Sequence, residues 1–379
     1  TNVKGLSISG GTVLSGGGMD AVQVRDVTKK NVSITGGSFS TDVGEYCAVG
    51  YQCNMPTEDE PLYTVTKKDA VVTVSRKLTL ANNLIITYTA KMPANYAEPY
   101  AEFNFWNNSL NEWQTSKVVG VANGVDADGN ATYTFAFTGV NPQRMNDTLK
   151  MTLFAKTTDS TEFVAITKEY TDSVAAYCNA VINNSTYNVN GRWTEVLSNL
   201  VAYGAASQKY MKYNETALVT DSVLNCVTKD YTGTQEITAV SGVSRKDGGI
   251  TITSVGMVLS SSYAVRVFFT LNDTTSLSDV TFTASIGGSS EQSFSKDDFT
   301  EQSYNGGTRY YFDYTGLNAR QLDSEITFTA TVGDTQDDTL GYSANTYLQY
   351  YITNPSANTV WNELVKWLFN YGWSCKNFK

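Results

Sequence analysis

An aromatic-rich segment offers the clearest binding chemistry in this sequence. Tyr100, Trp106 and Trp113 stand among asparagine and glutamate residues, and both tryptophans flank a polar turn. Exposed rings stack on the apolar C–H faces of sugars while neighbouring polar groups bind hydroxyls, so these three residues are candidate glycan contacts. Phe103 and Phe105 lie in the same segment, and their alternation instead predicts that they point into the core of a strand.

A second candidate is an acidic turn. Asp126, Asp128 and Asn130 have the oxygen spacing with which a calcium loop begins. A complete EF-hand loop needs a glutamate at its twelfth position, where this sequence has Phe137. The intervening glycine and asparagine tolerate positive φ, which favours a hairpin turn between two strands. We therefore expect no metal and no other cofactor, with this turn as a weak calcium candidate.

Cysteine chemistry is limited. Cys47 and Cys53 could close a short loop as a disulfide, and two separate thiols are the equal alternative. The five cysteines leave at least one unpaired, and their spacing matches no zinc pattern. The remaining cysteines are expected to be buried thiols.

Composition excludes several classes of function. The 379 residues contain no histidine, which removes Ser-His-Asp, Cys-His and HExxH centres. A net charge of −10 argues against a nucleic-acid partner, because phosphate binding needs clustered lysine and arginine. No stretch approaches ~18 consecutive apolar residues, so we expect no membrane insertion. The chain opens directly into a strand pattern, which indicates a fragment or a mature chain.

Acid pairs are the remaining catalytic option. Glycoside hydrolysis needs two carboxyl groups ~5–10 Å apart across a cleft. Several neighbouring acids are available: Asp297 with Asp298, Asp337 with Asp338, and Glu58, Asp59 and Glu60. Adjacent acids on loops normally lie on a solvated surface, and nothing in the sequence singles out one pair. We therefore expect a chain that is not an enzyme.

The elements that position these residues are indicated first by a short repeat. Residues 7–13 recur as residues 33–39, an offset of 26, with an alternating segment between them. Short strands and glycine turns at this period are typical of a parallel β-helix. About one and a half rungs are present, so residues 1–68 are predicted to be the last rungs of a longer stack and its cap.

A longer repeat divides the rest of the chain. Residues 133–141 are echoed by residues 310–318, and residues 193–204 by residues 361–372, in the same order. This pattern predicts two tandem domains, residues 69–222 and 223–379.

Each predicted domain combines strands with helices. Apolar residues recur at helical spacing after Trp193 and again after Trp361, so each repeat ends in an amphipathic helix. Ser173 and Ser343 are expected to cap the preceding helices. The predicted fold is mainly β with α: β-helix rungs, then two β-sandwich-like antiparallel α+β domains, each ending in a helical hairpin.

Taken together, these segments resemble a known arrangement. Residues 32–64, with the pattern I-x-G-G-x-F-S-x-D-V-x-x-Y-x-A-x-G-Y, resemble the terminal β-helix rung and cap of large surface proteins of gut Firmicutes. Both repeats resemble an uncharacterised domain near the C-terminus of such proteins, most clearly at residues 78–86, 133–145 and 203–210. The resemblance implies a secreted protein of the bacterial cell surface.

Three functional hypotheses follow. The first is a non-catalytic extracellular surface protein with a structural, adhesive or display role, whose partner is a host or dietary glycan or another surface protein. The second is a carbohydrate-binding accessory region of a secreted polysaccharide-degrading enzyme. The third is the C-terminal fragment of a β-helix lyase or hydrolase whose active site lies in preceding rungs.

Overall fold

The computed structural model describes residues 5–23, 32–48, 51–67, 72–80, 83–93, 95–107, 110–127, 129–157, 160–246, 248–260, 262–287 and 291–378. Within these ranges the chain is mainly β, with 45% of residues in strands and 23% in helices. The strands form several antiparallel sheets, and none of them closes into a barrel. The predicted mainly β class with added helices is therefore confirmed.

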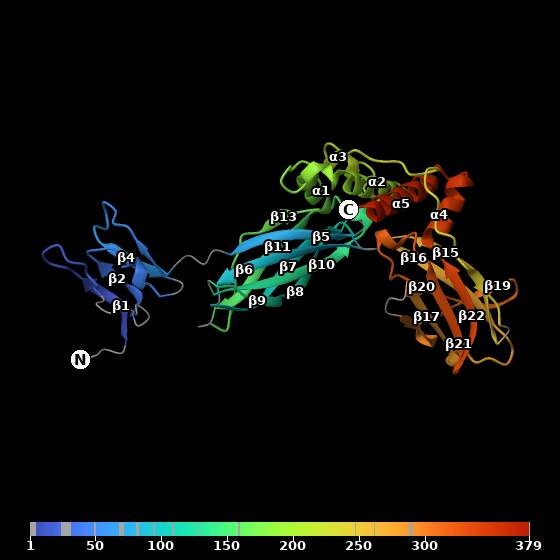
Figure 1. Ribbon diagram of the computed structural model, residues 1–379, viewed down its shortest axis with the longest axis horizontal. Helices are drawn as coiled ribbons and strands as arrows, with labels where there is room; N and C mark the ends of the chain where they lie inside the picture. Colours follow the sequence, from blue (N-terminus) through green and yellow to red (C-terminus); the bar gives the residue numbers. More distant parts are fainter. Residues whose placement is uncertain are drawn as a thin grey trace.

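The N-terminal strands form a small sheet with a core of its own (Figure 1). The strands are β1 (Leu6–Val13), β2 (Val32–Phe39), β3 (Tyr51–Asn54) and β4 (Tyr63–Lys67). β1 and β2 pair in parallel with Ile8 opposite Ile34, the register that the 26-residue repeat predicts. β4 then pairs antiparallel with both β2 and β3. The described residues thus contain one parallel pair, and the longer β-helix stays a prediction.

The next strands form two sheets whose inner faces pack together. They are β5 (Thr73–Leu80), β6 (Leu84–Pro93), β7 (Tyr96–Asn107), β8 (Glu112–Val119), β9 (Val121–Val125), β10 (Asn130–Val140), β11 (Leu149–Thr157), β12 (Phe163–Ala165) and β13 (Tyr170–Asp172). One sheet has the order β5-β6-β10-β9, and the other has the order β12-β11-β7-β8, with β13 also paired to β11. Tyr88 of the first sheet contacts Phe103 of the second, with ring centroids 5.7 Å apart.

Helices follow these strands, as predicted. They are α1 (Val174–Ile182), α2 (Thr194–Met211) and the short α3 (Val219–Ser222). The Ser173 hydroxyl caps α1 by accepting a hydrogen bond from the backbone N–H of Ala176 at 2.9 Å. The predicted apolar stripe of α2 is buried at Val196, Leu197 and Leu200. This stripe fixes which face of the helix meets the rest of the protein.

The C-terminal half contains a second pair of sheets and two helices. Its elements are β14 (Gly242–Ser244), β15 (Ile250–Leu259), β16 (Tyr263–Leu271), β17 (Val280–Ile286), β18 (Gln292–Phe294), β19 (Thr300–Tyr304), β20 (Gly307–Tyr314), β21 (Ile326–Val332), β22 (Thr335–Tyr342), α4 (Ala344–Thr353) and α5 (Thr359–Asn377). The Ser343 hydroxyl caps α4 at the backbone N–H of Thr346, also as predicted. No helix in the described part of the chain is long and apolar enough to cross a membrane.

Strand order is the same in the two pairs of sheets. The order β15-β16-β20-β19 reproduces β5-β6-β10-β9, and β22-β21-β17-β18 reproduces the sheet built on β11, β7 and β8. β14 is an addition at the edge of β22. The sequence repeat therefore coincides with a repeated order of strand pairing, so positions in the two halves have structural equivalents.

Helices α2 and α5 lie side by side and join the two halves (Figure 1). Tyr203 stacks on Tyr371 with ring planes 11° apart and centroids 6.0 Å apart. Two further ring contacts, related by the same 168-residue offset, flank this pair: Trp193 with Phe378 at 4.1 Å, and Trp361 with Tyr210 at 5.3 Å. Equivalent side chains thus exchange places across the contact, which is the arrangement of a two-fold interface.

Candidate functional site

The strongest candidate site is the outer face of the sheet formed by β8, β7, β11 and β12. Alternation along β7 buries Ala101 and Phe103 in the core and turns Tyr100 and Trp106 to the opposite face. The cross-strand register places further rings on that same face. We call this set the aromatic face: Tyr100, Trp106, Trp113, Phe154 and Phe163.

The two tryptophans form one end of the aromatic face. Trp106 of β7 lies directly opposite Trp113 of β8, and their rings meet edge to face with centroids 5.6 Å apart. Trp113 is 45% exposed. The Nζ atom of Lys150 lies 5.0 Å from the centre of the Trp113 ring. The sequence placed both tryptophans beside a polar turn, and the structure brings them into contact.

Tyr100 belongs to a second aromatic cluster further along β7. Its ring stacks on Phe154 at 5.1 Å and meets Phe163 edge-on at 5.0 Å. The ammonium of Lys117 lies 3.6 Å from the centre of the Tyr100 ring. Trp106 lies six positions after Tyr100 in β7, which is roughly 20 Å at the rise of a strand. The three predicted residues therefore share one face but form two clusters.

A polar strip lies between the two clusters. The register pairs Glu102 with Lys117 and Asn104 with Thr115 across β7 and β8. The Thr115 hydroxyl donates to the Asn104 Oδ1 at 2.6 Å, and the Asn104 Nδ2 donates to Glu102 at 3.4 Å. Carboxylate, amide, hydroxyl and ammonium groups therefore stand in a row between two sets of rings. That is the combination that binds the apolar faces and the hydroxyls of sugars.

Within the described residues, the equivalent face in the C-terminal half carries no such rings. Thr281 of β17 pairs with Thr331 of β21 at the position where Tyr100 pairs with Phe154. The next outward pair on these strands is Thr283 with Thr329. Since both sheets have the same strand order, the rings of the aromatic face are not required to build this kind of sheet.

The calcium candidate is a hairpin turn in the structure. Asp126 accepts a hydrogen bond from the backbone N–H of Asn130 at 2.9 Å, and Gly129 donates to the Asp126 carbonyl at 3.1 Å. Asp126 also forms an ion pair with Lys91, which brings a cation to this carboxylate. Asp128 lies outside the described residues. The described acids and cysteines contain no group of three that could hold a metal ion.

Cys47 and Cys53 are two thiols in this structure, without a disulfide between them. The Cys47 Sγ lies 3.7 Å from the carbonyl oxygen of Val43, to which it can donate. Burial raises the pKa of the Cys53 thiol, and the nearby Asp42 carboxylate raises it further. A raised pKa keeps the thiol protonated and unreactive near neutral pH. The disulfide stays a prediction for an oxidising environment.

Two of the paired acids are buried, contrary to the expectation of a solvated loop. Asp337 and Asp338 are each 1% exposed. Asp337 accepts hydrogen bonds from the backbone N–H groups of Gly248 and Ile250, and Asp338 binds the Arg245 guanidinium at 2.5 Å. Their position in β22 lets them hold the turn between β14 and β15. The solvated interpretation is correct for the exposed pair Asp297 and Asp298.

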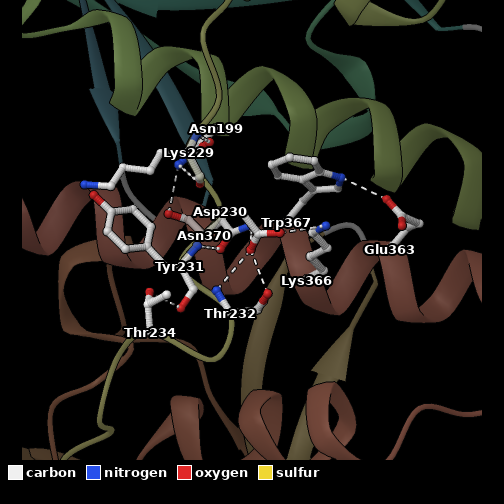
Figure 2. A network of polar contacts seen from close by, with 10 residues as sticks. All are labelled: Asn199, Lys229, Asp230, Tyr231, Thr232, Thr234, Glu363, Lys366, Trp367 and Asn370. Atoms are coloured by element: carbon white, nitrogen blue, oxygen red, sulfur yellow. Dashed lines mark hydrogen bonds and ion pairs between the residues drawn. The ribbon is translucent and has the colours of Figure 1, made fainter.

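A polar network between the two halves was missed by the sequence interpretation (Figure 2). Asn199 of α2 and Asn370 of α5 are fully buried. Asn199 binds both the carbonyl and the N–H of Lys229, at 3.2 and 3.1 Å, and donates to the Asn370 carbonyl at 3.2 Å. The Tyr231 N–H donates to Asn370 Oδ1 at 2.8 Å. The segment linking the halves is therefore bound to both helices, which limits any swinging of one half on the other.

An ion pair completes this network. Asp230 pairs with Lys366 of α5 at 2.9 Å and accepts hydrogen bonds from the N–H and hydroxyl of Thr232. Burial pushes the pKa of Asp230 upward, but the Lys366 ammonium and the Thr232 donors outweigh it and hold the pKa at about 2. Asn199 and Asn370 lie beside the apolar stripes of their helices and not in them, so the helical pattern gave no signal of this network.

Phe154, Phe163 and two lysines beside the rings, Lys117 and Lys150, were also missed. Phe154 follows Met151 and Leu153 in an apolar strand, so its outward direction became visible only with the register against Tyr100.

A comparison with protein-family models finds no match for this sequence, and a comparison with curated proteins finds no similar chain. The site is therefore interpreted from its geometry.

Proposed function

We propose that this chain is a non-catalytic extracellular protein of the cell surface that binds glycans through the aromatic face. The observation that carries the proposal is the pair of ring clusters on one exposed sheet face, separated by a polar strip. Rings at both ends would stack on sugar units, and the groups of the strip would bind their hydroxyls. The span of roughly 20 Å along β7 suits an extended chain better than a single sugar.

The contrast between the two halves supports a binding role rather than a packing role. Threonines fill the equivalent face in the C-terminal half, and threonine is well suited to a half-exposed strand. Large rings left partly exposed mark interaction sites more often than scattered apolar residues do. Trp113 and Phe163, exposed by 45% and 38%, are the most accessible rings of the aromatic face.

The proposed architecture follows the sequence repeats. The parallel pair β1–β2 would be the end of a parallel β-helix that serves as a stalk, capped by β3 and β4. Two tandem β-sandwich-like domains would follow, with the first domain presenting the aromatic face. The same face would serve a carbohydrate-binding accessory region of a secreted polysaccharide-degrading enzyme, so this remains the second candidate.

A glycan array tests the proposal. The chain is expected to bind one class of polysaccharide, and the variant W106A/W113A is expected to lose at least tenfold in affinity, or ~1.4 kcal/mol. Neutral and uronate-containing glycans both belong on the array, because Lys117 and Lys150 lie against the rings. Absence of binding to every glycan, or full binding by the variant, would contradict the proposal.

A further inference from the structure

A pocket of about 220 Å³ opens in the N-terminal half, apart from the aromatic face. Its walls come from strand β5, helix α1 and the start of helix α2, and its apolar lining includes Leu78, Leu80, Val181 and Trp193. A cavity of about 150 Å³ is large enough to hold a benzene ring. The pocket therefore has room for a single aromatic ring with a short substituent.

The C-terminal half shows the same position filled by a ring. Val181 and Tyr351 are equivalent, because each is the eighth residue after the capping serine of its helix, Ser173 or Ser343. The Tyr351 ring meets Trp361 edge-on, with centroids 6.0 Å apart. Trp361 is the counterpart of Trp193 in the repeat. A valine in the N-terminal half thus leaves open the space that a phenol ring occupies in the other half.

The burial of equivalent residues in β5 and β15 also differs between the two halves. Leu78 and Leu80 are only partly buried, whereas their register equivalents Met257 and Leu259 are buried. In the C-terminal half Tyr351 packs against the core beside Trp361, whereas the N-terminal pocket has Val181 at that position, with the rings of Tyr177, Tyr187 and Trp193 in its walls. A ligand ring in the pocket would complete the burial of Leu78 and Leu80.

The positive charge at the rim of the pocket indicates which group the ligand ring should carry. Arg192 lines the pocket, with its guanidinium carbon 5.6 Å from the centre of the Trp193 ring. No carboxylate in the described part of the chain forms an ion pair with Arg192. In the repeat the equivalent position is Val360, so the charge is not needed to build the helix pair. A guanidinium beside an apolar pocket matches a carboxylate in planar, two-point geometry.

We propose that this pocket binds a small aromatic carboxylate, with the ring where Tyr351 lies in the other half and the carboxylate on Arg192. The probe is 4-hydroxyphenylacetate, which joins the phenol of the tyrosine side chain to an acid. Its matched controls are 4-methylphenol, which lacks the acid, and hexanoate, which lacks the ring. Titration of the full chain by calorimetry or ligand-observed NMR measures all three.

Saturable binding of 4-hydroxyphenylacetate is expected, with both controls at least tenfold weaker. V181Y, which fills the pocket as the C-terminal half does, should abolish binding. R192Q changes an exposed side chain and should keep the fold. It should weaken the binding of 4-hydroxyphenylacetate about tenfold and leave the binding of 4-methylphenol unchanged. Y350A, an exposed tyrosine of α4 outside the pocket, should bind like the wild type. Failure of the wild type to bind the probe, or undiminished binding by V181Y or R192Q, would overturn the proposal.

Discussion

Asp337 and Asp338 are adjacent buried acids that accept hydrogen bonds from other groups of the chain. Their oxygens accept from backbone N–H groups at the β14–β15 turn, and Asp338 also binds Arg245. A buried carboxylate is stable only when its charge is paired and its lone pairs are bound. Asp338 meets both conditions and Asp337 is bound by backbone donors, so both acids stabilise the fold without any ligand and offer no free acid for catalysis.

Substitution of Asp338 should therefore destabilise the protein strongly. Asp338→Ala leaves Arg245 and two backbone N–H groups without their partner, and we expect a loss of about 3 kcal/mol in the free energy of unfolding. Asp297→Ala, in the exposed acid pair, should change it by less than about 0.5 kcal/mol. Urea denaturation of the two variants measures both values. Equal changes in the unfolding free energy of the two variants would show that the contacts of Asp338 do not stabilise the fold.

At the scale of elements, the connection between the halves depends on α2, α5 and the segment that crosses them. Each helix keeps an apolar stripe, but Asn199 and Asn370 interrupt the apolar surface and bind the crossing segment (Figure 2). Asp230 adds an ion pair to Lys366, and the donors around it hold its pKa at about 2. That pKa lies below the ordinary value of 3.8, so the charged form is stabilised in the folded state.

The Asp230 ion pair makes part of the stability dependent on pH. Its contribution is fully present above about pH 4 and is lost as the pH falls through about 2, because below that pH the carboxylate binds a proton in both the folded and the unfolded state. Asp230→Asn should lower the unfolding free energy by about 0.2–1 kcal/mol at pH 7, since the side chain is partly exposed. The difference from wild type should vanish below about pH 2. A pH-independent difference in thermal melts, or the same pH dependence in the exposed control Asp334→Asn, would contradict this assignment.

Elements were predicted more reliably than contacts between them. Ser173 and Ser343 cap their helices as expected, and the stripe after Trp193 is buried, because capping and periodicity are local properties. The offset of 26 residues predicted the parallel register of β1 with β2. The position of Phe154 against Tyr100 depends on the pairing of β11 with β7, which no local pattern encodes. The pocket beside Val181 required the comparison with Tyr351 in the other half.

At the scale of the whole molecule, two hydrophobic cores are present in the described residues. One core is confined to the N-terminal sheet, around Ile34 and Phe39. The other is continuous through both later halves and includes Tyr203 and Tyr371 at their contact. Residues that share one core unfold together, whereas separate cores unfold in separate transitions.

Calorimetry should therefore show two unfolding transitions. The larger one, from both later halves together, should have roughly five times the enthalpy of the smaller one, since the enthalpy scales with the number of residues. Phe39→Ala should lower the midpoint temperature of the smaller transition only. Leu368→Ala, in the buried stripe of α5, should lower the midpoint temperature of the larger transition without splitting that transition in two. Three transitions would show that the α2–α5 contact does not couple the halves.

Glycan binding at the aromatic face can be tested with a matched pair of double variants. The measurement is the Kd for the polysaccharide that gives the strongest array signal, compared among the wild type, Y100A/F154A and T281A/T331A. These substitutions remove equivalent cross-strand pairs from the two halves. Y100A/F154A should bind at least tenfold more weakly than the wild type, and T281A/T331A should bind with unchanged affinity. Equal affinities in all three proteins would contradict glycan binding at this face.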